Sequence, residues 1–187
     1  MKSILFVLTA LNFHFSQASY KAIRDGLWVQ ECLLGLIKQQ NINALHIELR
    51  ENFYQDRNCQ DVSFVFRTEG SLSYEDFNTT QINFIYSEIE LSLWINEVVS
   101  DFNERQVCGL DDWKLGVFQK ITGLQCALFN THKSSPIPAV GDMKYGIFKI
   151  EDGQLYYGKL SKEFDGSAAA KRPIEFDLNY FKHLEIR

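Results

Sequence analysis

The sequence predicts an all-β fold, an antiparallel up-and-down barrel of about eight to ten strands with at most one short helix. Apolar and polar residues alternate with a period of two over most of the chain, which is typical of half-buried strands. Polar, turn-like segments separate consecutive runs, and closing such a meander into a barrel removes its exposed edges. The length of 187 residues, with 45% apolar and 14% aromatic residues, fits one domain with a large core.

Residues 1–18 have the pattern of a secretory signal peptide. Lys2 gives the segment a positive start, residues 4–11 form a mostly apolar run, and the segment ends on small residues suited to cleavage. The run is shorter than the roughly 20 apolar residues that span a bilayer. We therefore expect cleavage near Ala18, a single domain over residues 19–187, and a secreted or periplasmic protein with no transmembrane segment in the mature chain. A buried first strand or helix is the alternative.

The first half of the domain predicts three strands, at residues 26–32, 42–53 and 62–70. Within the second run, every other residue from Leu45 to Leu49 is apolar, and the residues between them are polar. The polar stretch 55–58 then forms a hairpin loop, and Cys59 begins the return strand.

The second half predicts a turn at residues 76–80 and strands at residues 81–93, 145–150, 154–160 and 178–184. Alternation in the first of these strands changes phase near Ser87, which indicates a β-bulge. Residues 94–104 are the only candidate helix, because apolar residues recur every four positions from Trp94 to Phe102, although a strand is the alternative. Residues 151–153 predict a tight hairpin turn.

The four cysteines favour disulfides, because an even number in a chain that looks exported is typical of an oxidising compartment. Four cysteines allow three connectivities, which the sequence leaves open. We favour sequential pairing, Cys32 with Cys59 and Cys108 with Cys126, because each bond then joins neighbouring strands. Each bond would contribute about 3–4 kcal/mol by loop closure. A zinc site is the alternative, but it needs closely spaced cysteine pairs that this chain lacks.

Gly26-Leu27-Trp28 resembles the Gly-x-Trp signature of the lipocalins and the wider calycins. In that family the tryptophan closes the barrel floor, and a basic residue near the last strand packs across its ring. The resemblance therefore implies structural roles for Gly26 and Trp28, with Arg172 or Arg187 as the cation–π partner. An ordinary core position is the alternative role for Trp28.

The wider layout is similar to exported bacterial lipocalin-like proteins of calycin type whose function is uncharacterised. The similar positions are Cys32, Tyr54, Asn58-Cys59, Gly70, residues 108–113 and 122–126, Tyr156, Gly158, residues 165–167 and Arg172-Pro173. The disulfide spacing differs from that of secreted animal lipocalins, and their later strand motifs are absent. The resemblance implies the barrel fold and, through it, ligand binding, although a fold alone does not fix function.

Six aromatic residues are candidates for the barrel interior: Phe64, Phe66, Phe84, Tyr86, Trp113 and Tyr156. In an eight-stranded barrel such side chains either fill the interior or line a pocket for one small apolar ligand. The sequence leaves both open.

Nothing in the sequence has the pattern of a catalytic or metal site. There is no Gly-x-Ser-x-Gly motif, and His46, His132 and His183 do not stand at metal-ligand spacing. A net charge of −5 without a basic cluster argues against nucleic-acid binding. We expect neither an enzyme nor a cofactor.

Two functions remain from the sequence. The first is an exported protein that binds a small hydrophobic ligand or lipid. The alternative is a structural or protein-interaction module of the cell envelope, with a filled barrel and no ligand.

Overall fold

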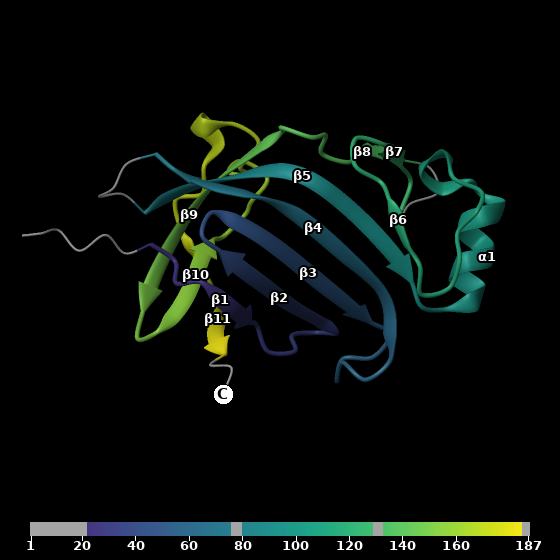
Figure 1. The fold of residues 1–187 in the computed structure, drawn as a ribbon, viewed down its shortest axis with the longest axis horizontal. Helices are drawn as coiled ribbons and strands as arrows, with labels where there is room; N and C mark the ends of the chain where they lie inside the picture. The colour runs from purple at the N-terminus through teal and green to yellow at the C-terminus, as the bar shows by residue number, and fades with distance from the viewer. Residues whose placement is uncertain (1–21, 76–79, 129–132, 185–187) are drawn as a thin grey trace, which may run out of the picture.

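The structure, a computed structural model, describes residues 22–75, 80–128 and 133–184 (Figure 1). Eight antiparallel strands form a closed barrel in the order β4-β3-β2-β1-β11-β10-β9-β5, and β5 pairs back with β4. These strands are β1 (Gly26–Val29), β2 (Leu36–Asn43), β3 (His46–Tyr54), β4 (Val62–Tyr74), β5 (Gln81–Leu93), β9 (Met143–Glu151), β10 (Gln154–Gly158) and β11 (Phe176–Leu184). The predicted all-β barrel is confirmed.

The smaller elements lie beside the start of β4 and the end of β5, at the right of Figure 1. They are the helix α1 (Asn96–Glu104), the 3-10 helix η1 (Val107–Gly109) and the short strands β6 (Phe118–Lys120), β7 (Gln125–Cys126) and β8 (Ser135–Pro136). We call residues 94–128 the wing. A second 3-10 helix, η2 (Ala169–Lys171), lies in the connection between β10 and β11. Within the described ranges α1 is the one α-helix, and it is too short to span a membrane.

The sequence prediction is wrong for the segment before residue 46. One strand over residues 42–53 was expected, whereas β2 and β3 form a hairpin in which Asn43 pairs with His46. Ala44 makes this turn with a φ of 55°, and its N–H donates to the Asp25 carboxylate. The two turn residues, Ala44 and Leu45, are neither glycine nor asparagine, which usually mark such a turn, so the turn could not be recognised from the sequence.

Gly70 does not end its strand as expected, since β4 continues to Tyr74. The register shifts there, with Glu69 paired to Glu88 and Gly70 paired to Tyr86, so Ser87 is the extra residue of the predicted bulge. A Cβ on Gly70 would lie only 2.7 Å from the Phe84 ring, which explains the glycine.

The other predicted boundaries agree closely. The candidate helix is α1, and the turn between β9 and β10 uses Asp152 and Gly153 with φ of 51° and 74°. Most of the predicted turn at residues 76–80 lies outside the described residues.

One end of the barrel is filled, and we call it the closed end. Each of the eight strands contributes one buried apolar side chain to it: Trp28, Ile42, Ile47, Leu72, Ile82, Phe148, Leu155 and Phe181. Burial of each such side chain contributes about 1.5–3 kcal/mol. This cluster also identifies the inward face of every strand, because alternate residues of a strand point the same way.

A second core lies between the wing and the ends of β4 and β5. It joins Ile89, Leu91 and Leu93 of β5 to Phe102 of α1 and to the Cys108–Cys126 disulfide. The other disulfide joins Cys32 to Cys59. The predicted sequential pairing is therefore confirmed.

Candidate ligand-binding site at the barrel mouth

Above the closed end, the inward side chains change from apolar to polar. This end of the barrel, which we call the mouth, is where β2 and β9 begin and β3 ends. On β2, Lys38 and Gln40 share the inward face with Ile42, and on β9 Lys144 shares it with Phe148. We call six of the inward polar residues the polar ring: Lys38, Gln40, Glu51, Tyr86, Lys144 and Tyr157.

The side-chain amide of Gln40 lies deep in the barrel, where its oxygen has a hydrogen-bond partner and its nitrogen has none among the described residues. The side chain is 2% exposed, and the Tyr157 hydroxyl donates to its Oε1 at 3.1 Å from the opposite wall. Burial raises the pKa of the Tyr157 phenol, which therefore stays neutral and able to donate. The Gln40 Nε2 group is buried without a hydrogen-bond partner among the described residues. Leaving such a donor unpaired costs about 1–3 kcal/mol.

The three charged residues of the ring leave one positive charge uncompensated. Lys38 and Glu51 face each other on β2 and β3, and their charged atoms lie 2.7 Å apart. Lys144 is half-buried and forms none of the ion pairs found among the described residues. Burial lowers the pKa of Lys144, the charge of Lys38 lowers it further, and the charges of Glu51 and Asp165 oppose the shift.

A pocket of about 540 Å³ opens beside Lys144 and Tyr86. Its remaining walls come from two loops and the start of β9: Pro138, Asp142, Met143, Tyr145, Asp165, Gly166 and Ser167. Burial is the main cause that raises the pKa of Tyr86, with the charges of Glu51 and Asp142 adding to it. The volume lies in the range of small-molecule sites, about 300–1,000 Å³.

Aromatic side chains line the inward face between the polar ring and the wing. Phe53 and Phe64 stack with ring centroids 4.5 Å apart, and Phe66 contacts both rings edge to face. We call these three residues the aromatic triad, and all three are only partly buried. A second cavity of about 310 Å³ lies between this face and α1, lined by Ser63, Phe64, Leu91, Leu93, Val98, Asp101, Phe102, Arg105 and Leu128.

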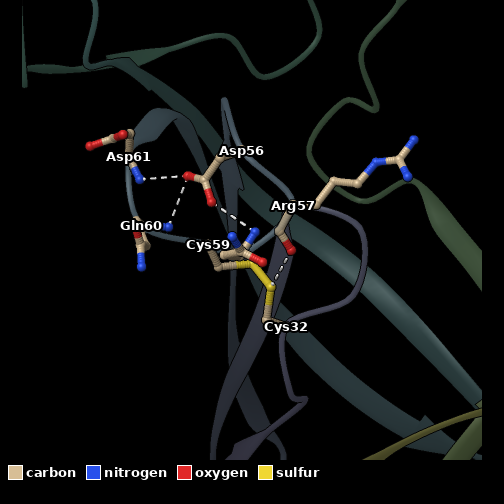
Figure 2. Close-up of a disulfide and its surroundings, with 7 residues drawn as sticks. Cys32, Asp56, Arg57, Cys59, Gln60 and Asp61 are labelled. Carbon is tan, nitrogen blue, oxygen red and sulfur yellow. Dashed lines mark hydrogen bonds between the residues drawn. A yellow bond between two sulfur atoms is a disulfide. The ribbon is translucent and has the colours of Figure 1, made fainter.

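The Cys32–Cys59 disulfide fixes the two loops at the mouth (Figure 2). It joins the β1–β2 loop to the β3–β4 loop, and the bridged Cys32 Sγ lies 3.2 Å from the Arg57 carbonyl oxygen. The carboxylate of Asp56 accepts three backbone N–H groups in the second loop, those of Asn58, Gln60 and Asp61. The Asp61 N–H is the main cause that holds the pKa of Asp56 below its ordinary value.

The structure places four of the six predicted interior aromatics on the inward face: Phe64, Phe66, Phe84 and Tyr86. Trp113 and Tyr156 lie elsewhere. Trp113 is buried in the wing, where its indole packs against Phe102 and donates to the Val107 carbonyl at 3.3 Å. Tyr156 faces outward, because it alternates with the buried Leu155 and pairs with Tyr180 on the outer surface.

Trp28 lies on the barrel floor, as the resemblance implied, but Arg172, one of its two expected arginine partners, does not pack against it. The ring that packs against Trp28 belongs to His183 of β11, with centroids 4.9 Å apart. A Cβ on Gly26 would lie 2.7 Å from the His183 ring, so the glycine makes room for this contact.

Arg172 instead fastens the β10–β11 connection to the outside of β5 and β9. Its guanidinium donates to the carbonyls of Ile82 and Gly146 and to Asn83, and it pairs with Glu75. The aromatic ring beneath it is Tyr145, at 5.3 Å. Arg187 and His132 lie outside the described residues.

Sequence reasoning missed five of the six residues of the polar ring. Lys38 and Gln40 belong to the unrecognised strand β2, and Lys144 lies just before the predicted start of β9. One signal was present: Lys144 alternates with Gly146 and Phe148, which places a lysine on an otherwise apolar face.

No known protein family model matches the chain, and no curated protein matches its sequence. Among the described residues there is no group of three or more side chains suited to hold a metal ion.

Proposed function

We propose that the protein is an exported binding protein of lipocalin-like type that holds a small amphiphilic molecule at the barrel mouth and catalyses no reaction. The observation that carries this proposal is the unpaired Gln40 amide nitrogen, fully buried within the barrel. Buried donors in folded proteins are nearly always paired. Gln40 lines neither of the two pockets described above, so a ligand removes this cost if its polar head extends inward from the pocket beside Lys144 and brings an acceptor to Nε2.

The surrounding geometry supports the same proposal. The pocket beside Lys144 opens to solvent, and the aromatic triad supplies partly exposed apolar surface on the same inward face. Sites for small molecules typically combine apolar walls with a few polar groups that fix orientation.

The alternative function, a protein-interaction module, has one observation in its favour. Several apolar side chains outside the cores are strongly exposed, among them Leu34, Val140, Ile174 and Leu178, which is 89% exposed. These residues lie on separate loops and strands, and single exposed apolar residues are common on soluble proteins. They do not explain the polar ring.

Native mass spectrometry of the purified protein tests the proposal together with titration by the fluorescent probe 1-anilinonaphthalene-8-sulfonate. We expect either a co-purified small molecule or saturable probe binding at one site per chain, weakened by Lys144→Met. If the protein carries no molecule and binds no probe, the interaction module becomes the better account.

Export is part of the proposal. Disulfides are typical of proteins that leave the reducing cytosol, and this chain has two. The proposed leader, residues 1–18, lies outside the described residues. N-terminal sequencing of the protein recovered from the medium or periplasm should begin at Ser19. An uncleaved chain that stays in the cytosol would overturn this part.

A further inference from the structure

We infer that the polar ring selects the charge of its ligand, and that the molecule bound at the mouth is an anionic amphiphile, an apolar chain ending in a carboxylate. This inference rests on the proposed function and adds to it the chemical class of the ligand.

Within the polar ring, the acceptors named here have partners, whereas two donors have none in the described part of the chain. Glu51 is paired with Lys38, and the Oε1 acceptor of Gln40 is paired with the Tyr157 hydroxyl. The polar nitrogens left over are Lys144 Nζ, which takes part in none of the ion pairs among the described residues, and Gln40 Nε2, which is buried there without an acceptor. Both are donors, so the complementary ligand brings acceptors.

The charge of the ring points to a negative ligand. Lys38 and Glu51 cancel each other, which leaves Lys144 as a half-buried cation. A partly desolvated charge without a partner is unfavourable, and a carboxylate against an ammonium relieves that cost through a charge-assisted hydrogen bond.

The acidic residues at the rim of the pocket are engaged within their own loops. The Asp142 carboxylate accepts the Ala139 N–H at 2.8 Å, and the Asp165 carboxylate accepts the Ser167 N–H at 2.9 Å. Lys171 lies 3.7 Å from Asp165 and offsets its charge. Neither carboxylate forms an ion pair with Lys144 among the described residues, so the ammonium is available to a ligand, while Asp142 keeps its negative charge at the rim.

The apolar part of the ligand has a surface to contact on the same inward face. The aromatic triad is partly exposed there, and the apolar cavity beside α1 continues from Phe64. A molecule with a charged head at Lys144 and a hydrocarbon body along these rings satisfies both surfaces.

Calorimetric titration with three compounds of equal chain length tests the inference: dodecanoate, dodecan-1-ol and dodecylammonium. We expect dodecanoate to bind at least about 10-fold more tightly than the alcohol, the factor that corresponds to 1.4 kcal/mol, and the ammonium compound to bind most weakly. Lys144→Met should remove the preference for dodecanoate over the alcohol, whereas Lys144→Arg should keep it.

Lys149→Met is the matched control. Lys149 is on the same strand, but it faces outward, where it lies over the Tyr156 ring and pairs with Glu151, so dodecanoate binding should not change. Lys144→Glu should reverse the preference towards dodecylammonium, which no loss of folding would produce.

The possible outcomes distinguish a failure of this inference from a failure of the proposed function. If the alcohol and dodecanoate bind equally well, the inference is wrong and the proposed function stands. If dodecylammonium binds most tightly, the inference is also wrong. If none of the three compounds binds, the inference is wrong, and the proposed function fails with it when the protein also carries no molecule and binds no fluorescent probe.

Discussion

The closed end and the mouth are built from the same strands and the same inward face, yet they differ in chemistry. On β2 the inward residues run from Ile42 through Gln40 to Lys38, and on β9 they run from Phe148 to Lys144. At the closed end one apolar side chain from each strand fills the interior. At the mouth the inward positions of these strands carry polar groups, two of which are donors that have no partner among the described residues. The barrel therefore has an apolar, filled end that contributes to stability and a polar end where we propose that ligand binds.

The largest effect should come from opening the closed end. Leu155 is 0% exposed, and Leu155→Ala leaves a cavity among the eight packed side chains. We expect the free energy of unfolding to fall by about 2–5 kcal/mol in urea titrations. Lys144→Met at the mouth is the comparison and should not destabilise the fold. Equal losses for both variants would contradict the division of the barrel into two ends.

The disulfide at the mouth should have the next largest effect. Replacing both Cys32 and Cys59 with serine frees two loops that the bond joins across 27 positions of sequence. We expect a loss of about 2–4 kcal/mol in unfolding free energy. Dodecanoate binding should weaken in the same variant, because the loops adjoin the strand ends that carry Lys38 and Glu51. Unchanged binding would mean that the loops do not shape the site.

A double-mutant cycle on Gln40 and Tyr157 should give a smaller effect. Gln40→Met leaves the buried Tyr157 hydroxyl without its acceptor, at about 1–3 kcal/mol, but it also removes the unpaired Nε2 donor, so the net change in unfolding free energy should be small. Adding Tyr157→Phe removes the stranded hydroxyl, so the double variant should be more stable than Gln40→Met alone. Additive losses in chemical denaturation would show that the two side chains do not interact.

The smallest effect is the pH dependence of Lys144. Its pKa is lowered by burial, so the folded chain binds fewer protons than the unfolded chain between this lowered pKa and the ordinary value. Stability should therefore rise slightly with pH across that window, while affinity for dodecanoate falls, since only the ammonium attracts a carboxylate. The charged groups that act on Lys144 are Glu51, Lys38 and Asp165. Both trends should vanish in Lys144→Met, and their persistence there would assign them to another group.

The sequence predicted the closed end far better than the mouth. Alternation locates β4, β5, β9 and β11 because their buried residues are apolar and period two is strong. In that pattern a polar residue on the inward face cannot be told from a polar residue on the outward face, so nothing in the sequence marks Lys38 and Gln40 as inward. Tyr156 shows the converse, since the sequence predicts this aromatic residue to be interior and it lies on the outer face.

Tertiary pairing decided the remaining differences. His183, and not Arg172, reaches Trp28 because β11 pairs with β1 in a register that puts the two residues opposite each other. Arg172 is held on the outer face by two carbonyl groups and Asn83, which no local pattern reveals. Trp113 lies in the wing because the chain leaves the barrel between β5 and β9.

In the proposed function, ligand enters the mouth and leaves the closed end untouched. Two-dimensional ¹H–¹⁵N NMR during titration with dodecanoate tests it directly, because the indole N–H of Trp28 marks the closed end and donates to the Arg24 carbonyl at 2.9 Å. We predict shifts for the backbone amides of Lys38, Glu51 and Lys144, with the Trp28 indole signal unchanged. A shift centred on the Trp28 indole, with the mouth amides unmoved, would contradict the account.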